Sequence, residues 1–345
     1  MAFVSVKACG MVTAVGFNAP ASIAAVRAGI RRIEDEVLWN YEFGDYIAAG
    51  KVPLRHWWTG VGKLAGLVVP AIRECLSAAS PAVAGDIPLL LGLPALDRPA
   101  RWPNLEERIF SEIEQQLGIP LHQLSQTISR GNVSGVAAVE MASRLIEEGA
   151  VEHCIVAGVD SFIDQEMINP YLRDRRILTT TNSNGFSPAE AGAAVLLDAP
   201  SGRPTGELRI LGMALADEPA PINSDQPLRG KGLGEAIRRA LAASGIGISE
   251  IDYFITDLNG EYYKFKEAAL SVLTLWSSND EKGIDYWHPI ESLGEIGAAI
   301  GPCALGLALI ANQKGYAPSP SVLLHFSNDD HERAALVAKF ENHSN

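Results

Sequence analysis

The stretch Gln126-Thr-Ile-Ser-Arg-Gly-Asn132-Val-Ser-Gly135-Val-Ala-Ala-Val-Glu140 decides the fold of this chain. A short strand pattern ends just before Gly131, and a helix of very small residues begins at once. The glycines permit a sharp turn, and the alanines predict a helix buried against neighbouring backbones. Enzymes place a nucleophile at such a strand-to-helix turn, where helix N–H groups stabilise negative charge. The residue at this turn is Asn132, and an amide is not a nucleophile.

The composition is that of an ordinary globular protein. The 345 residues are 47% hydrophobic and 20% charged, enough to bury a large core in one domain or in two fused halves. A formal charge of −13 argues against a nucleic-acid-binding surface, because phosphate contacts need clustered Lys and Arg. The longest basic cluster, Arg173-Asp-Arg-Arg176, is short and interrupted by acid, which favours a solvated loop.

The cysteines and the apolar segments indicate the cellular compartment of the protein. Four cysteines stand far apart without metal-ligand spacing: Cys9, Cys75, Cys154 and Cys303. This usage suits a reducing cytoplasm and argues against a structural zinc site. The N-terminus lacks the pattern of a signal peptide, and the most apolar stretch is about half the length that spans a bilayer. We therefore expect a soluble, cytoplasmic protein without a membrane partner, and inert buried thiols at Cys154 and Cys303.

The order of predicted strands and helices repeats along the chain. The first copy comprises a strand in Phe3–Val15, the helix Gly60–Ala79, the strand Ile87–Leu93, the helix Leu105–Leu117, the turn at Asn132 with its small-residue helix, and the strands His153–Asp160 and Glu190–Asp198. The second copy comprises, in the same order, Glu207–Leu215, Lys231–Ser244, Ile251–Asp257, Tyr262–Trp276, the small-residue helix opened by Gly294, Ser321–Phe326 and Ala334–Phe340. Such alternation predicts a layered α/β protein.

The duplication predicts two similar halves around a pseudo-two-fold axis. The segment Pro200-Ser-Gly-Arg-Pro204 has the composition of a linker, so residues 1–200 form the expected N-terminal half and residues 201–345 the C-terminal half. The two small-residue helices are expected to pack together in the middle, because Gly and Ala allow helix backbones to approach closely.

An aromatic segment interrupts the first half. Between Glu34 and Trp58 the pattern is irregular and includes Trp39, Tyr41, Phe43, Tyr46, Trp57 and Trp58. A loop covering a core is the favoured interpretation, and a ligand or partner surface is the alternative. The sequence leaves open whether Trp39–Trp58 is a lid or a docking surface.

Three motifs resemble the β-ketoacyl synthase branch of the thiolase superfamily. The run from Cys9 to Gly16, Cys-Gly-Met-Val-Thr-Ala-Val-Gly, resembles the family's opening Gly-Met-Val-Thr-Pro-Leu-Gly. Residues 142–149 with 155–158 resemble its Ala-Arg-Leu-Ile-Arg-Ser-Gly and Val-Ala-Gly-Gly segments, and residues 184–194 resemble Asp-Gly-Phe-Val-Leu-Gly-Glu-Gly-Ala-Gly-Val. The resemblance covers essentially the whole chain. It implies a thiolase-like fold of five αβαβα layers built from two duplicated halves.

The resemblance also implies where the family's catalytic residues would lie. In the family a cysteine takes the acyl group from a thioester, and two His residues, or His and Asn, promote decarboxylation of malonyl units. Position by position, the cysteine falls on Asn132, the first histidine near Asn259 and the second on Glu295. The glycine-rich loop corresponds to His325-Phe-Ser-Asn-Asp329 and is acidic here. With every catalytic position replaced, we expect no catalytic residue, no cofactor and no metal ion.

Several residues have competing interpretations. Ser134 is a weak candidate nucleophile that would need Glu295 or a histidine as its base, and a hydroxyl bonded within its own helix is favoured. Asn132 is expected to cap a helix, and the helix dipole favours Glu295 near the start of the second small-residue helix. His325 is interpreted as structural. The adjacent Asp329, Asp330 and His331 form a poor metal site, because neighbouring loop residues cannot easily surround one ion.

The resemblance implies a catalytically degenerate, non-condensing protein. The family dimerises by joining sheets edge to edge, and its non-catalytic subunits include chain-length factors, so a homodimer or a heterodimer with a related subunit is expected. An acyl carrier protein is a further candidate partner. A secreted effector is another, since type VI secretion clusters can carry such proteins beside effector genes. The alternative is an enzyme of the 3-oxoacyl-ACP synthase type acting on acyl thioesters, as an acyltransferase, hydrolase or malonyl decarboxylase. Against decarboxylation, an ionised Glu295 would repel an enolate.

Overall fold

The computed structural model confirms an α/β protein. It describes residues 4–55, 59–79, 85–201, 206–273, 275 and 283–341. Four predicted segments therefore fall partly outside the described residues: the strand that starts at Phe3, the aromatic segment at Trp57 and Trp58, the helix that ends at Trp276, and the linker up to Pro204.

Ten strands form two equivalent sets of five. The first set is β1 (Val4–Thr13), β4 (Leu89–Gly92), β5 (Gln126–Ile128), β6 (His153–Ser161) and β7 (Glu190–Asp198). The second set is β8 (Glu207–Asp217), β9 (Tyr253–Thr256), β10 (Asp285–Trp287), β11 (Ser321–Ser327) and β12 (Glu332–Glu341). Their hydrogen-bonded order is β10-β9-β11-β12-β8-β1-β7-β6-β4-β5, so each strand has a counterpart at the mirrored place. This order confirms the predicted duplication.

The two sets join only briefly, where β1 pairs with β8 over Val4 to Val6. Beyond that junction each set is a sheet of its own. Within each sheet the inner pairs are antiparallel, and the three outer strands are parallel to one another. Parallel strands buried on both faces read as continuous apolar runs, which explains the pattern of β4.

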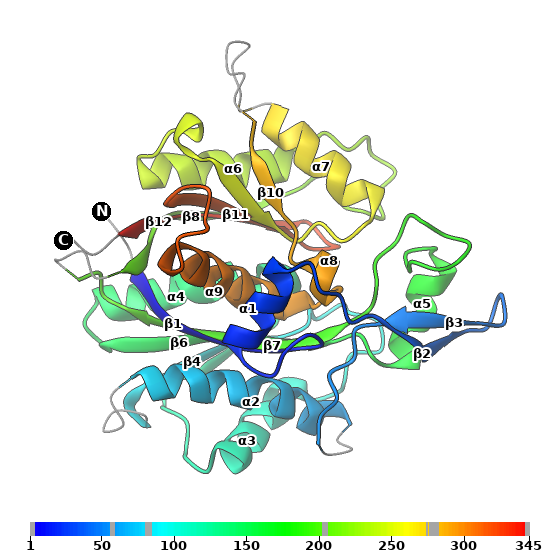
Figure 1. Cartoon of the computed structure of the whole chain (residues 1–345), viewed down its shortest axis with the longest axis horizontal. Helices are drawn as coiled ribbons and strands as arrows, with labels where there is room; N and C mark the ends of the chain where they lie inside the picture. Colours follow the sequence, from blue (N-terminus) through cyan, green and yellow to red (C-terminus); the bar gives the residue numbers. More distant parts are fainter. Residues whose placement is uncertain are drawn as a thin grey trace.

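The helices fill three layers around the sheets. The α-helices are α1 (Ala19–Arg27), α2 (Gly60–Ala78), α3 (Leu105–Leu117), α4 (Ser134–Glu147), α5 (Gln165–Arg173), α6 (Lys231–Ser244), α7 (Tyr262–Leu273), α8 (Ile290–Leu293) and α9 (Ile300–Gln313). Short 3-10 turns are η2 (Gly131–Val133), η3 (Ile248–Glu250) and η4 (Gly297–Ala299). Figure 1 shows α4 and α9 between the two sheets, α2 and α3 on one outer face, and α6 and α7 on the other. The predicted αβαβα architecture is confirmed.

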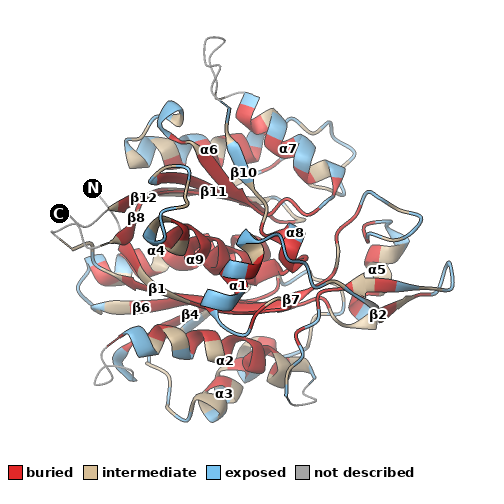
Figure 2. Cartoon of the chain, in the orientation of Figure 1, coloured by how far each residue is buried: buried red, intermediate tan, exposed pale blue. Residues whose placement is uncertain are grey.

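The middle layer depends on glycine. A Cβ atom on Gly135 of α4 would lie 2.9 Å from the Cα atom of Gly301 in α9, and the reverse contact is equally short. The two helix backbones touch at this point, as the sequence predicted. Figure 2 shows buried residues running through both sheets and the helices between them, whereas the outer helices expose one side.

The loop predicted for the aromatic segment is wrong over part of its length. β2 (Glu34–Asn40) and β3 (Asp45–Ala49) pair as an antiparallel hairpin. Leu38 and Ile47 point into a small core, while Tyr41 and Phe43 are exposed at the tip. Alternation of buried and exposed residues is the pattern of a strand, and the many aromatic residues of this segment hide that pattern in the sequence.

Within the part of the chain that the structure describes, no helix is both long enough and apolar enough to cross a bilayer.

Candidate functional site

The strand-to-helix turn brings Asn132 into the centre of the molecule. β5 ends at Ile128, and Gly131 adopts φ +54°, a conformation that suits glycine, before η2 leads into α4. Asn328, from the end of β11, lies against this turn, since a Cβ atom on Gly131 would lie 3.1 Å from Asn328 Oδ1. The side chain of Asn132 is buried at the junction of the two halves, with the residue 8% exposed.

Asn132 does not cap a helix, so that prediction is wrong. Its Nδ2 atom donates to Asp257 Oδ2 at 2.9 Å and, more weakly, to Glu295 Oε1 at 3.5 Å. No side-chain cap is present on η2 or α4. The reason is position: Asn132 lies inside η2, one residue after its start, and the residue that precedes α4 is Val133.

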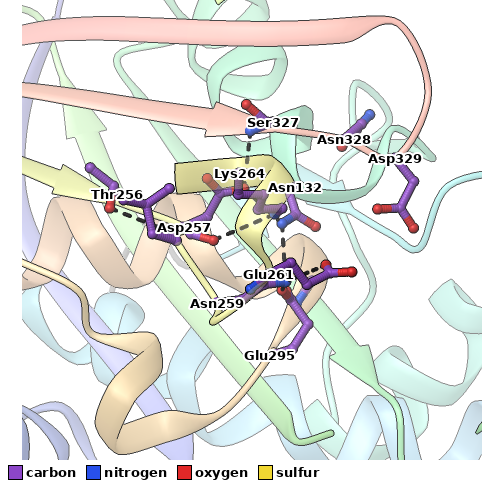
Figure 3. A network of polar contacts seen from close by, with 12 residues as sticks. Asn132, Thr256, Asp257, Asn259, Glu261, Lys264, Glu295, Ser327, Asn328 and Asp329 are labelled. Atoms are coloured by element: carbon purple, nitrogen blue, oxygen red, sulfur yellow. Dashed lines mark hydrogen bonds and ion pairs between the residues drawn. The ribbon is translucent and has the colours of Figure 1, made fainter. Parts of the chain in front are cut away.

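The structure brings Asn259 and Glu295 to the same place. Asn259 Nδ2 donates to Glu295 Oε2 at 2.7 Å and to Glu261 Oε2 at 3.1 Å, and the backbone N–H of Gly297 donates to Glu295 Oε1 at 3.0 Å. Figure 3 shows Asn132 from the first half of the chain close to Asn259 and Glu295 from the second half. Burial raises the pKa of Glu295, and nearby Asp257 adds to this, while Lys264 and the N–H donors oppose it.

A buried ion pair supports the site from α7. Lys264 Nζ lies 2.8 Å from Asp257 Oδ2, and the two side chains are 4% and 1% exposed. Asp257 also accepts from the backbone N–H of Ser327 at 3.0 Å. Burial opposes ionisation of Asp257, but Lys264 and the N–H donors outweigh it and lower its pKa. The sequence did not single out Lys264; a lysine on the inner side of a partly apolar helix was the available signal.

Two arginines close the side of the site nearest α5. Arg98 pairs with Asp160 at 2.8 Å, and Arg176 pairs with Glu261 at 2.7 Å and with Asp329 at 2.8 Å. The interpretation of the basic cluster as a solvated loop is therefore wrong for Arg176, which is buried. Burial works against the ionised form of Asp329, yet Arg176 outweighs this and lowers the pKa of Asp329 to about 2.

Ser134 lies near the turn but is not prepared as a nucleophile. Its hydroxyl donates to the backbone oxygen of Ile128 at 2.9 Å and accepts from the backbone N–H of Arg130 at 3.1 Å. It is thus bonded to the strand before the helix, and not within its own helix as expected. Neither contact is a base that could activate the hydroxyl.

The acidic loop after β11 does not gather around an ion. Asp329 is held by Arg176, and His331 Nδ1 contacts the backbone oxygen of Glu218 at 2.9 Å. Among the residues that the structure describes, no group of three His, Cys, Asp or Glu side chains could hold a metal ion.

The buried thiols are poorly reactive. Burial raises the pKa of Cys154 and of Cys303 to about 12, so their thiolate forms are scarce at neutral pH. Neither thiol can replace the nucleophile that is missing at Asn132.

A small cavity opens beside the site. It has a volume of about 140 Å³, and its walls include Asn132, Asn259, Lys264, Glu295 and Asn328. Binding sites for drug-sized molecules range from about 300 to 1,000 Å³. This cavity therefore admits a small group and has no room for a long acyl chain.

No protein-family model matches the sequence, and no curated protein matches it either. Solved structures match it over nearly its whole length. A ketosynthase in complex with its chain length factor from Xenorhabdus doucetiae is 18% identical, with a TM-score of 0.76 over 98% of each chain. The ishigamide ketosynthase/chain length factor is 16% identical, with a TM-score of 0.72 over 98% of this chain and 99% of that one. A chain from a complex of a type II polyketide synthase acyl-carrier protein with its ketosynthase is 15% identical. Its TM-score is 0.76, over 97% of this chain and 98% of that one.

The chain has the ketosynthase fold. The thiolase-like architecture implied by the sequence motifs is thereby confirmed, with two duplicated halves and the strand-to-helix turn in the middle. At identities below 20% the likeness concerns the fold, so function has to be argued from the site itself.

Proposed function

We propose that this chain is a catalytically degenerate ketosynthase-fold protein that acts as a non-condensing partner, in the manner of a chain-length factor. The observation that carries the proposal is the bonding of Glu295. Its carboxyl group accepts hydrogen bonds from Asn259 Nδ2 at 2.7 Å and from Asn132 Nδ2 at 3.5 Å, so these amide groups do not point at a substrate.

The chemistry of condensation needs what this site lacks. A thioester must be attacked by a nucleophile, and donors must point at the oxygen on which negative charge develops. Asn132 offers no nucleophile, and its N–H groups are directed at carboxylates. A carboxylate at Glu295 would repel the enolate that decarboxylation produces. The site therefore favours a role in binding another protein over a role in catalysis.

An open sheet edge supports a protein partner. β5 is the last strand of its sheet, and Gln126 is exposed on it. A free edge presents unpaired backbone groups that a strand from a second chain can bind. Structures with this fold include a ketosynthase with its chain length factor and a ketosynthase with its carrier protein. We propose a related ketosynthase-fold chain as the partner, with a carrier protein or a secretion effector as the other candidates for the test.

The proposal is tested by offering acetyl- and malonyl-pantetheine to the purified chain. Intact-mass measurement should show no acyl adduct, and the malonyl thioester should not be converted to the acetyl thioester. An adduct on the chain, or decarboxylation that disappears in Glu295→Gln, would contradict the proposal. Mixing the chain with a related ketosynthase, a carrier protein and an effector, followed by native mass measurement, distinguishes the partners.

One observation favours a second function, that of an acyl-thioester hydrolase. Burial raises the pKa of Glu295, and a carboxyl group with a raised pKa beside a cavity can act as a general base toward water. The same assay separates the two functions. A hydrolase would release free pantetheine thiol at a rate that falls in Glu295→Gln, whereas a non-condensing partner would release none above the buffer blank.

A further inference from the structure

The cavity beside Asn132 has an excess of negative charge. The charged residues of its lining are the carboxylates Glu295, Asp329, Asp330, Asp97 and Asp174 and the cations Arg98, Arg176 and Lys264. Asp160, Glu261 and Asp257 lie behind the lining and pair with these cations. Each cation is ion-paired with a carboxylate other than Glu295. Within the described residues no ion pair joins Glu295, although it is only 3% exposed. Lys264 is near enough to favour the ionised form of Glu295, but it makes its ion pair with Asp257. A bound positive charge would therefore stabilise a buried carboxylate that has no ion pair of its own.

The second observation is an unused acceptor that faces the same cavity. Asn132 lines the cavity and directs Nδ2 at Asp257 and Glu295, but its Oδ1 atom accepts no hydrogen bond from the described residues. Figure 3 shows that oxygen turned away from Asp257. An oxygen in this position matches a ligand that donates a hydrogen bond.

We propose that this cavity binds a small primary ammonium group, held by the carboxylate of Glu295 and the side-chain oxygen of Asn132. An ammonium carries three N–H donors and one positive charge, which suits both groups together. The volume of about 140 Å³ limits the ligand to a short amine. This inference goes beyond the proposed function, because the isolated chain binds the ammonium whether or not it also binds a protein partner.

The experiment titrates the full chain with ethylammonium chloride by calorimetry, with potassium chloride holding the ionic strength constant. A single saturable site is expected. Glu295→Gln should weaken binding about tenfold or more, which corresponds to about 1.4 kcal/mol. The control is Glu107→Gln, because Glu107 is an exposed carboxylate of α3 that does not line the cavity and should change the affinity less than about twofold. Non-saturable heats, or equal losses in the two variants, would overturn the proposal.

A second measurement uses the unaltered chain, since Glu295→Gln also disturbs the acceptor of several N–H groups. Phe162 and Tyr171 line the cavity, so transferred NOEs should connect their ring protons with the methyl group of ethylammonium. Binding without these NOEs would place the ligand elsewhere and overturn the proposal. Tetramethylammonium, which has no N–H donor, should not displace ethylammonium. Displacement at equal concentration would show attraction to charge alone and also overturn it. Neither measurement depends on thioester turnover, so its outcome is distinguishable from that of the proposed function.

Discussion

The buried ring of His325 couples the folding of this protein to pH. His325 lies in β11 against Phe254, only 1% exposed, and neither ring nitrogen has a hydrogen-bond partner among the described residues. Burial disfavours the imidazolium, and nearby His288 and Lys264 reinforce this while Asp257 opposes it, so the pKa of His325 falls to about 4. The unfolded chain takes up a proton near pH 6.5, whereas the folded chain resists it until about pH 4.

His325 therefore stabilises the fold less as the pH falls from about 6.5 toward 4. At pH 7 both states hold a neutral ring, and below pH 6.5 only the unfolded state gains the proton. We expect the free energy of unfolding of the unaltered chain to drop relative to His325→Leu by up to about 3 kcal/mol between pH 7 and 4. Urea unfolding of both proteins across this range measures the difference. Parallel pH curves would show that His325 is not the group responsible.

At the residue scale the sequence located part of the site. Motif order led to Asn132, Asn259 and Glu295, and the structure brings the three together. It did not lead to Lys264 or Arg98, whose partners lie on other elements. A motif records local chain geometry, whereas the pairing of charges across layers depends on packing that no short pattern encodes.

At the scale of elements, the contact between α4 and α9 should tolerate no side chain at Gly135. A Cβ atom there would lie 2.9 Å from Gly301 Cα and 3.1 Å from Pro302 Cδ. Both neighbours belong to a buried helix that cannot move aside cheaply. Gly135→Ala should therefore lower the free energy of unfolding by about 1–3 kcal/mol, measured by chemical denaturation.

The control for that substitution is Gly62→Ala in α2. A Cβ atom on Gly62 would meet only the carboxylate of Glu112, at an ordinary 3.6 Å. Alanine restricts the unfolded chain more than glycine does, so this variant should gain about 0.4–1 kcal/mol. If both variants gained stability, helix propensity would explain the result and the close approach at Gly135 would not matter.

The ion pair between α7 and the end of β9 provides a second test at this scale. Removing one partner of a buried pair leaves the other charge uncompensated, so Lys264→Met should cost about 3–5 kcal/mol. Adding Asp257→Asn should recover part of the loss, because the stranded carboxylate is then removed. Thermal and urea unfolding report both effects. Lys266→Met is the matched control, since Lys266 is exposed on the same helix and should change stability by less than about 0.5 kcal/mol.

Elements with strong terminal signals were predictable from the sequence. The bounds of α3 and α6 agree with prediction to the residue, since each ends at a glycine in the left-handed conformation, Gly118 and Gly245. The β2–β3 hairpin was missed because its alternation is short and its outward residues are aromatic. Aromatic side chains look like core in a sequence, and only packing shows which of them face solvent.

At the scale of the whole molecule, the duplication follows from how small residues are distributed. Two helices of Gly and Ala can occupy one central layer, and that layer obliges a sheet on each side and an outer helix layer beyond each sheet. From these stretches the sequence predicted two helices packed together in the middle, whereas the five layers were implied by the resemblance of its motifs to the ketosynthase family. The sequence could not predict that carboxylates accept the hydrogen bonds of Asn132 and Asn259, because these residues come from different parts of the fold.

The open edge of β5 gives the whole-molecule prediction. The backbone N–H of Leu93 donates to the oxygen of Ile128 at 3.0 Å, so Ile128 faces β4. Successive residues of a strand direct their backbone groups to opposite sides, so those of Thr127 face the open edge. Proline at that position removes an outward N–H without breaking the ladder to β4.

Thr127→Pro should therefore disrupt association through this edge while leaving the fold intact. If the chain forms a homodimer or a heterodimer with a related subunit by extending this sheet, native mass spectrometry across a range of concentrations should show a loss of affinity of about tenfold or more in the variant. Thr127→Val keeps the N–H donor and the branched shape, so it should associate like the unaltered chain. Equal association of all three proteins would mean that any partner binds elsewhere, and unfolding of the proline variant alone would be visible in its circular dichroism.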